Sequence, residues 1–226
     1  MAPADHRRDH AVTDRRTAIL EATARLIARR GVRGLRMDEL ATEAGVSTAL
    51  VYYHFKDRAG ILRHTLRFLT DRARRYSTAR DGHEPTEPLD SLEQSLLLEL
   101  QDRADMRENG IAWGELRAGA IFEPELREPL TEAGGSWIRE VTDLLAHARP
   151  AAAGTDLASS AERLTALREG LSARHLSGAL HPEHARTLMK EALAIEIAHL
   201  DQASPPGVRQ HPPPRECLNR RPSEFD

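Results

Sequence analysis

The sequence predicts an all-α protein, and three observations support this prediction. Aromatic residues make up only 4% of the 226 residues, so the core must consist mainly of Leu, Ala, Ile and Val. Runs of β-branched residues are few, which favours helices over strands. Apolar residues also recur three and four positions apart along most of the chain, which is the spacing of one face of a helix.

The first helical pattern begins at Arg15, after a charged, His-rich segment without periodicity (1–12) that we expect to be a loose, disordered arm. Four apolar residues share one face of this helix: Ile19, Ala22, Leu26 and Ile27. Gly31 and Gly34 follow it, and a glycine beyond the last turn commonly ends a helix. A compact group of helices comes next, and its last member is predicted over about 58–75.

The segment 80–88, RDGHEPTEP, is predicted to be a loop because it is rich in Gly and Pro, and it separates predicted domains over 13–75 and 85–202. The second domain is predicted to hold helices from about 90, over 105–120, from 124, over 137–146, over 156–178 and over 182–200. Gly110 and the pair Gly134-Gly135 are candidate interruptions of these helices. Residues 203–226 are rich in Pro and polar residues, so we expect a disordered tail there.

The charge is distributed unevenly along the chain. Residues 1–76 contain 16 Lys and Arg against 9 Asp and Glu, a net charge of +7. Residues 77–202 contain 12 against 23, a net charge of -11. A basic N-terminal third on an acidic body suits a module that meets a polyanion, although a chance scatter of solvated charges would give the same totals.

The most informative stretch is MDELATEAGVSTALVYYHF, over 37–55. Its first part predicts a short amphipathic helix, after which Gly45 tolerates the positive φ of a sharp turn. Ser47 can then cap a second helix that runs from Thr48 to Phe55. A short helix, a glycine turn and a second helix at this spacing form the helix-turn-helix pattern, whose second helix enters the major groove of DNA.

The longer string LATEAGVSTALVYYHFKDRAGIL, over 40–62, resembles the tetracycline-repressor (TetR) family of bacterial transcriptional regulators. The resemblance is strong over 13–75 and looser over 85–200. It implies an N-terminal three-helix DNA-binding domain and a larger C-terminal helical bundle for effector binding and dimerisation. It also implies a repressor that binds a palindromic DNA operator as a homodimer and is released by a small-molecule effector.

The resemblance and the side-chain chemistry together assign DNA-contacting roles. Thr48 and Ala49 are placed to meet base edges, while Tyr53, His54 and Lys56 are expected to contact phosphates. The remaining candidates for DNA binding are Arg36, Ser47, Tyr52 and Arg58. Ser47 has a purely capping role as its alternative, and Tyr52 is equally suited to the DNA or to the core. Phe55 is expected in the core, and Asp57 is expected to cap the next helix.

Two residues depart from the family pattern. Arg36 stands where the family commonly has Thr, and a guanidinium there can hold a phosphate although it cannot cap the helix. Arg58 stands where the family usually has Lys, and it keeps the positive charge. These departures leave the operator sequence open.

The acidic half carries the candidate sites for an effector and for dimerisation. The expected effector contacts are Trp113, Glu115, Arg117, Phe122, Trp137 and His175. The expected dimer contacts are Leu164, Leu167, Leu171, Leu188, Ala192 and Ile195. In each case the alternative is that the apolar side chains pack only within one chain and the charges are solvated.

The sequence holds no nucleophile elbow, P-loop, dinucleotide fingerprint or pair of closely spaced cysteines, so we expect no enzymatic activity and no cofactor. The alternative is an enzyme or binding protein with a vestigial helix-turn-helix, and activation instead of repression is also open. The pair His181 and His184 could ligate a metal, but surface positions are the simpler interpretation. Cys217 lies in the expected disordered tail, which argues against a redox role. The polar N-terminus, the single cysteine and the lack of a long apolar run predict a cytoplasmic, nucleoid-associated protein without membrane contact.

Overall fold

The computed structural model describes residues 4–78 and 87–203, and every regular element in these two ranges is helical. The first range contains α1 (Ala4–Arg30), the 3-10 helix η1 (Val32–Gly34), α2 (Met37–Glu43), α3 (Thr48–Phe55) and α4 (Arg58–Thr78). The second contains α5 (Pro88–Leu97), η2 (Leu98–Leu100), α6 (Ala104–Gly119), η3 (Pro124–Leu126), α7 (Arg127–Ala148), α8 (Gly154–Leu176) and α9 (Pro182–Ala203). The all-α prediction is therefore confirmed.

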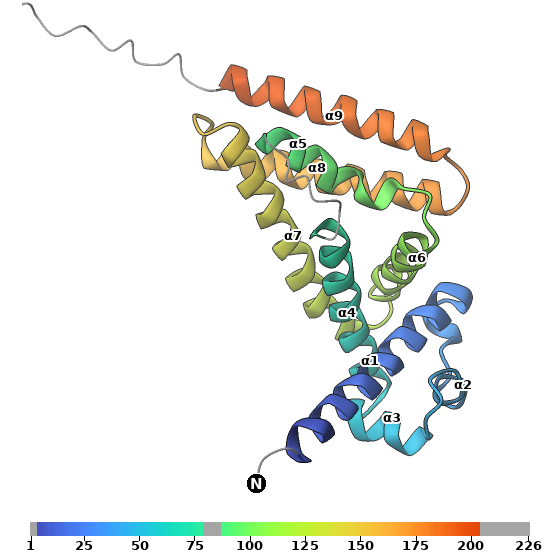
Figure 1. Cartoon of the computed structure of the whole chain (residues 1–226). Helices are drawn as coiled ribbons and strands as arrows, with labels where there is room; N and C mark the ends of the chain where they lie inside the picture. The colour runs from blue at the N-terminus through green and yellow to red at the C-terminus, as the bar shows by residue number, and fades with distance from the viewer. Residues whose placement is uncertain (1–3, 79–86, 204–226) are drawn as a thin grey trace, which may run out of the picture.

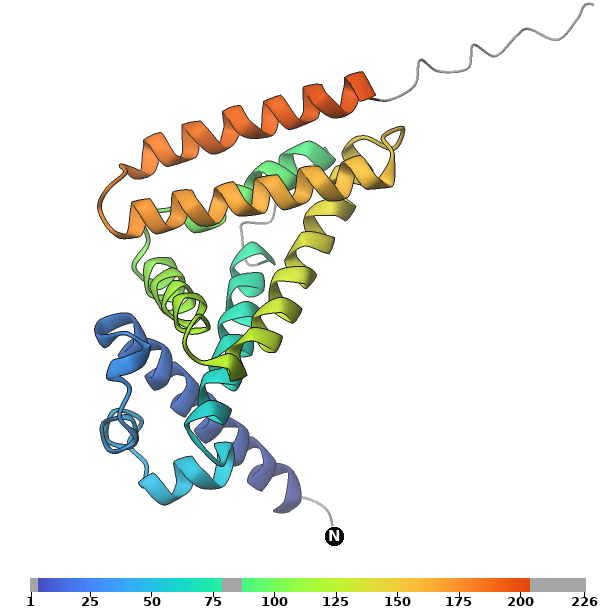
Figure 2. The same cartoon turned by 180° about the vertical axis from the view of Figure 1, so that it is seen from behind.

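The helices form a small N-terminal unit and a larger bundle, and α4, α6 and α7 run between the two ends of the molecule (Figure 1). Helices α1, α2 and α3 lie at one end, and α5, α8 and α9 lie at the other. A short turn joins α8 to α9, so these two long helices run antiparallel, side by side, as Figure 2 shows from behind. The helix-turn-helix is thus held at the end of the molecule farthest from this hairpin.

Two buried apolar clusters hold the described residues together. The first combines residues of α1 to α4, such as Ile19, Leu40 and Phe55, with Ala112 and Leu116 of α6. The second joins α5, α7, α8 and α9. Its members include Leu92, Leu96, Val141, Leu145, Leu164, Leu171, Met189 and Leu193. Because the first cluster includes α6, the N-terminal unit packs directly on the body although the sequence predicts separate domains.

Two helix caps expected from the sequence are present. The Ser47 hydroxyl accepts a hydrogen bond from the backbone N–H of Leu50 at 3.2 Å and caps α3. The Asp57 carboxylate accepts the backbone N–H of Gly60 at 2.6 Å and caps α4. Gly45, in the turn between α2 and α3, has a φ of 66°, a conformation that costs glycine little. These local interactions fix the direction in which α3 leaves the turn.

Helix α1 begins at Ala4, so most of the segment 1–12 is helical and the expected arm is wrong over residues 4–12. The physical reason is local: no Gly or Pro interrupts residues 4–30, and Ala and Arg are strong helix formers. The expected boundary loop lies mostly outside the described residues, as do the expected C-terminal tail and Cys217.

Helix α7 is continuous through Gly134 and Gly135, where a break was a candidate. Each glycine costs about 1 kcal/mol relative to alanine in a helix, which the packing of α7 against α4, α5 and α8 can offset. Helix α6 is likewise continuous through Gly110. A Cβ atom on Gly110 would lie 3.0 Å from the Leu176 Cδ1 atom, so this glycine permits the close approach of α6 to the end of α8.

Candidate DNA-binding surface and ligand cavity

Helix α3 presents one face to the core and the other to solvent. Val51 and Phe55 are buried in the first apolar cluster, as expected for Phe55. On the outer face, Tyr53 is 79% exposed and Tyr52 is 45% exposed. Neighbouring exposed aromatic side chains often mark a surface that binds a partner. The tyrosine hydroxyl can also hydrogen-bond a polar partner.

Most of the other residues assigned to DNA also reach the surface. Ser47, Ala49 and Lys56 are exposed, and Thr48 and His54 are half-buried. Arg36 is exposed at the start of α2, where its guanidinium lies 3.5 Å from the Asp38 carboxylate. Since both members of that pair face solvent, Arg36 is accessible to an outside anion.

Arg58 is placed differently from the other candidates. Its guanidinium forms an ion pair with Glu123 at 2.7 Å and donates to the Val32 backbone carbonyl at 2.8 Å. It therefore joins the start of α4 to η1 and to the segment before η3. Nearby, the Val32 backbone N–H donates to the Glu115 carboxylate of α6 at 3.2 Å. The two side chains together fasten the N-terminal unit to the body.

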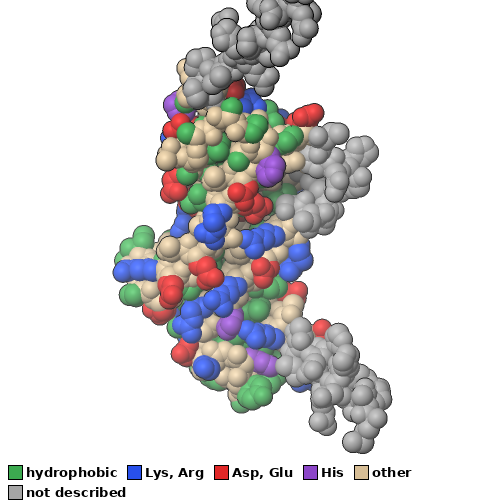
Figure 3. All heavy atoms as spheres, turned by 90° about the vertical axis from the view of Figure 1, so that its left-hand side faces the viewer, with side chains coloured by type: hydrophobic (Ala, Val, Ile, Leu, Met, Phe, Trp, Pro, Cys, Tyr) green, Lys and Arg blue, Asp and Glu red, His purple; other side chains and the backbone are tan. Residues whose placement is uncertain are grey.

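Ion pairs also fix α2, the first helix of the motif, against α1. The Glu43 carboxylate meets Arg25 at 3.1 Å and Arg29 at 2.7 Å. These hydrogen bonds hold the pKa of Glu43 below its ordinary value. Arg30 forms a further ion pair with Glu39. In Figure 3 lysine and arginine side chains are spread over the lower part of the molecule, where α1 to α3 lie, with hydrophobic side chains at the lower tip.

His64 of α4 supports α3 from behind. Its ring packs edge-on against Phe55, with ring centroids 5.5 Å apart, and the Arg16 guanidinium lies 3.0 Å from its Nδ1 atom. Burial lowers the pKa of His64 below its ordinary value, and the positive charges of Arg16, Arg67 and Arg63 lower it further. A neutral imidazole therefore fits this position better than a charged one.

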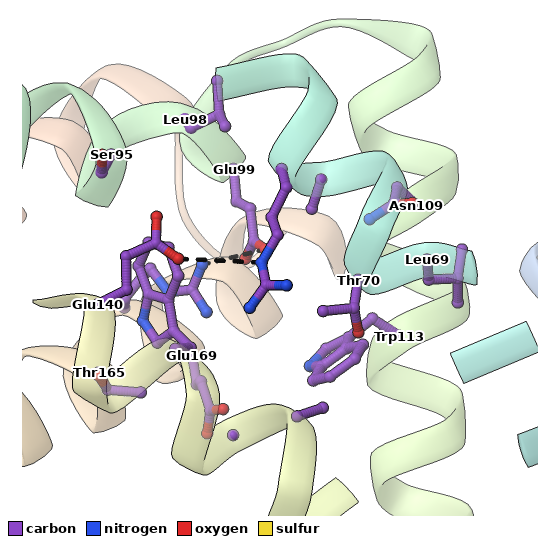
Figure 4. A pocket seen from close by; sticks show the side chains of 16 residues that line it. Leu69, Thr70, Ser95, Leu98, Glu99, Asn109, Trp113, Glu140, Thr165 and Glu169 are labelled. Atoms are coloured by element: carbon purple, nitrogen blue, oxygen red, sulfur yellow. Dashed lines mark ion pairs between the residues drawn. The ribbon is translucent and has the colours of Figure 1, made fainter. Parts of the chain in front are cut away.

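A cavity of about 70 Å3 lies in the body between α4, α6, α7 and α8. Trp113, Asn109, Leu69 and Thr70 lie on one side of it, and Glu140, Thr165 and Glu169 lie on the other (Figure 4). Its wall also includes Leu98, Glu99, Ala133, Gly134, Trp137 and Arg168. The lining combines apolar side chains with nine polar or charged ones, so it offers a small molecule both apolar contact and hydrogen-bonding groups.

Two of the six expected effector residues, Trp113 and Trp137, line this cavity. The other four lie elsewhere. Glu115 and Phe122 face a surface hollow beside η1, and Glu115 is occupied by the Val32 N–H. Arg117 forms an ion pair with Glu169 and lines a smaller neighbouring hollow. His175 is buried in α8 and does not line any of these three spaces.

Arg168, Thr165 and Glu99 line the cavity but are not among the effector contacts expected from the sequence. One signal was available for Arg168, because it follows Leu164 by four positions and precedes Leu171 by three. A charged residue in line with the apolar face of a helix is seldom buried unless it has a partner. Here the partner is Glu99, 3.0 Å from the Arg168 guanidinium.

The α8–α9 hairpin divides the expected dimer contacts into two groups. Leu164 and Leu171 are buried in the core of the single chain, so they are not available to a second chain. Leu167, Leu188 and Ala192 are partly buried at its edge. Ile195 is 68% exposed and stands on the same face of α9 as Leu188 and Ala192. The exposed residues of α8 include the small Ala166, Gly170 and Ala173, together with charged residues such as Arg163, which pairs with Glu196 of α9.

His181 and His184 are both exposed at the start of α9. Within the two described ranges, no helix has an apolar stretch long enough to cross a membrane.

Comparison with known proteins matches both parts of the chain. Residues 19–65 match the model for bacterial regulatory proteins of the tetR family. Residues 88–198 match the model for the C-terminal region of BetI-type transcriptional repressors. A curated relative, the HTH-type transcriptional regulator BetI of Agrobacterium fabrum, is 29% identical over 161 residues, which is 71% of this chain and 76% of the relative.

Two solved structures show the same arrangement of helices. A putative TetR-family regulator from Rhodococcus sp. is 42% identical, with a TM-score of 0.75 over 82% of this chain and 99% of that one. A putative transcriptional regulator from Saccharomonospora viridis, solved in complex with choline, is 26% identical, with a TM-score of 0.70 over 80% and 96% of the two chains.

The helix-turn-helix, its exposed outer face and these matches define a DNA-binding transcriptional regulator. The chain belongs to the TetR family.

Proposed function

We propose that this protein is a repressor in the cytoplasm that binds a palindromic operator as a homodimer and releases it when a small molecule occupies the cavity. The observation that carries the proposal is the outer face of α3, where Tyr53, Tyr52 and Lys56 stand exposed beside Ala49. Ala49, near the N-terminus of α3, would meet base edges. The tyrosine hydroxyls and the Lys56 ammonium would hold phosphates. Arg58 is left out of the proposed contacts because its guanidinium is already held by Glu123 and Val32.

The proposed dimer rests on the exposed face of the α8–α9 hairpin. Leu188, Ala192 and Ile195 form a stripe on α9, and the small residues on α8 would let a second helix approach closely. Pairing two hairpins around a two-fold axis would bury this stripe and present two α3 helices to the DNA. To enter successive major grooves those helices must stand about 34–36 Å apart.

The proposed effector site is the cavity lined by Trp113 and Trp137. A regulator of 26% identity with the same arrangement of helices has been solved with choline, which supports a small molecule as the occupant of such a cavity. Trp113 and Glu115 both belong to α6. Trp113 lines the cavity, and Glu115 accepts a hydrogen bond from the Val32 N–H, so one helix contacts both the cavity and the N-terminal unit. To change the ratio of the DNA-binding state to the released state from 99:1 to 1:99, a ligand must bind the released state about 10⁴-fold more tightly.

A binding titration on duplex DNA from the promoter beside the gene tests the proposal. We expect the full-length protein to retard this duplex in a gel shift, and Tyr53→Ala and Lys56→Ala to weaken binding about 10-fold or more. Loss of the Lys56 phosphate contact should also lower the salt slope of the affinity by about one.

The chain supplies a matched control, because Lys190 is its only other lysine and lies on α9, paired with Glu93 at 2.7 Å. Lys190→Ala should leave the DNA affinity unchanged. If the wild-type protein bound no palindrome near its own promoter, the proposal would fail. A reporter under that promoter, compared in strains with and without the gene, distinguishes repression from activation.

A further inference from the structure

The cavity contains buried hydrogen-bond donors that have no partner. The indole Nε1 of Trp137, the hydroxyl of Thr165 and the guanidinium Nε of Arg168 are each shielded from solvent and unpaired. All three residues line the cavity. Thr165 and Arg168 are only 6% and 7% exposed, so neither side chain can turn outward to find water at the surface.

Two of these three groups are donors only. An indole N–H and a guanidinium N–H cannot accept a hydrogen bond, and the threonine hydroxyl can donate as well as accept. Buried donors without partners cost free energy, and nearly all such groups in folded proteins are paired. A hydrogen-bond acceptor brought into the cavity from outside the chain would supply the missing partner.

The three carboxylates of the cavity wall each lie near an arginine. Glu99 pairs with the Arg168 Nη1 atom at 3.0 Å, and Glu140 lies 4.0 Å from the Arg74 Nε atom. Glu169 pairs with Arg117. Each of these three carboxylates therefore already has an arginine nearby, which weakens its attraction for an incoming cation.

The aromatic surface is also partly occupied. The Arg168 guanidinium lies 4.4 Å from the centroid of the Trp137 ring, in cation–π geometry. A cationic headgroup would have to displace this internal cation from that face of the ring. Both the charges and the aromatic stacking therefore disfavour a positively charged ligand.

We propose that the cavity recognises a small, largely apolar molecule through a carbonyl or carboxyl oxygen, and that Arg168, Thr165 and Trp137 anchor that oxygen. The inference rests on the proposed function only in taking the cavity as the effector site. The apolar part of the ligand would lie against Leu69, Leu98 and the Trp113 ring, which all line the cavity.

Intrinsic fluorescence of the full-length protein reports binding directly, because its only two tryptophans both line the cavity. The probes share one apolar tail and differ in the headgroup: hexanamide, hexanoate and hexyltrimethylammonium. We expect a saturable change in emission with the amide or the carboxylate, at least 10-fold tighter than with the ammonium. Comparing the amide with the carboxylate distinguishes the two sources of the acceptor oxygen.

Two substitutions remove single donors and keep the Arg168–Glu99 pair. Thr165→Val should weaken binding of the better acceptor probe about 10-fold. Thr70→Val is its matched control in the lining of the same cavity, because the Thr70 hydroxyl already donates to the Leu66 carbonyl at 2.9 Å. Trp137→Phe should also weaken binding, whereas Trp113→Phe keeps all three donors and should retain it.

The inference is overturned if the ammonium probe binds most tightly, if no acceptor probe binds, or if Thr165→Val and Trp137→Phe leave the affinity unchanged. DNA binding by the same preparation without ligand separates these outcomes from a failure of the proposed function. A protein that binds DNA and responds to the ammonium probe contradicts only the inference. A protein that binds the acceptor probe but no operator contradicts only the proposed function.

Discussion

The His64 ring packs against Phe55 of α3, so protonation of this ring bears on the stability of that contact. The ring also lies beside Arg16, and burial together with three nearby arginines lowers the pKa of His64. The unfolded chain therefore binds this proton more readily than the folded one. The stability that the neutral ring contributes is complete above the ordinary pKa of 6.5 and is lost as the pH falls through the folded value.

We accordingly expect the urea midpoint of unfolding to fall between pH 7.5 and pH 5.5, and His64→Gln to reduce this fall. Exposed carboxylates contribute little in this window, because the shifted ones have pKa values below their ordinary values, which are near 4. His184→Gln is the control, since His184 is exposed on α9. An unchanged pH dependence in the His64 variant would contradict the argument.

At this scale the sequence predicts local interactions well. Ser47 and Asp57 cap their helices because each bonds to a backbone group three residues away, which spacing alone can indicate. Arg58 shows the limit of such inference. Its partners, Glu123 and Val32, are 65 and 26 residues away along the chain, and no local pattern brings them together.

The glycines of the long helices have different consequences for stability. A Cβ atom on Gly134 would meet nothing within 4 Å, although the residue lines the cavity. A Cβ atom on Gly110 would meet Leu176 Cδ1 at 3.0 Å. The first glycine leaves space for a ligand, and the second lets two helices pack closely.

Gly134→Ala is therefore expected to stabilise the protein by up to about 1 kcal/mol, because alanine is the better helix former and the unfolded chain loses freedom. Thermal unfolding should show a higher Tm for this variant. Gly110→Ala should give no gain, since the Leu176 side chain must move to accommodate the methyl group. A lower Tm for Gly134→Ala would show that the site is more crowded than the geometry indicates.

Some helix starts were predictable from the sequence, but the start of α1 at Ala4 and the continuity of α6 and α7 were not. Pro88, Pro124 and Pro182 each mark the start of a helix, where the missing N–H costs nothing. The continuity of α7 through Gly134 and Gly135 depends on neighbours that come from three separate helices, α4, α5 and α8. Tertiary packing of this kind overrides local propensity, so composition alone could not reveal it.

For the whole molecule, the exposed stripe on α9 gives the clearest test of the proposed dimer. Ile195→Lys places a charge at the most exposed position of that stripe and should convert the protein to a monomer in sedimentation velocity, with DNA affinity reduced at least 10-fold. Ile121→Lys is a closely matched control, because Ile121 is also 68% exposed but lies between α6 and η3, away from the hairpin. A dimer that survives Ile195→Lys would exclude this face as its interface.

The overall architecture followed from the sequence to the extent that it depends on periodicity and on the helix-turn-helix string. The cavity did not, because its wall is assembled from α4, η2, α6, α7 and α8. Trp113 and Trp137 were found because tryptophan is rare in this chain. Thr165 and Glu99 are common residue types, and only the packing of distant helices gives them a role.

Helix α4 runs without interruption from α3 to the cavity. Its first turn is buried against α3, and residues such as Thr70 and Ala73 line the cavity. From Gly60 to Ala73 a rigid helix measures about 20 Å at roughly 1.5 Å per residue. Used as a lever arm pivoting beside the ligand, it would turn a tilt of about 5° into a displacement of about 2 Å at α3. In a two-fold assembly both arms would swing, and the span between the two recognition helices would change by up to twice that amount.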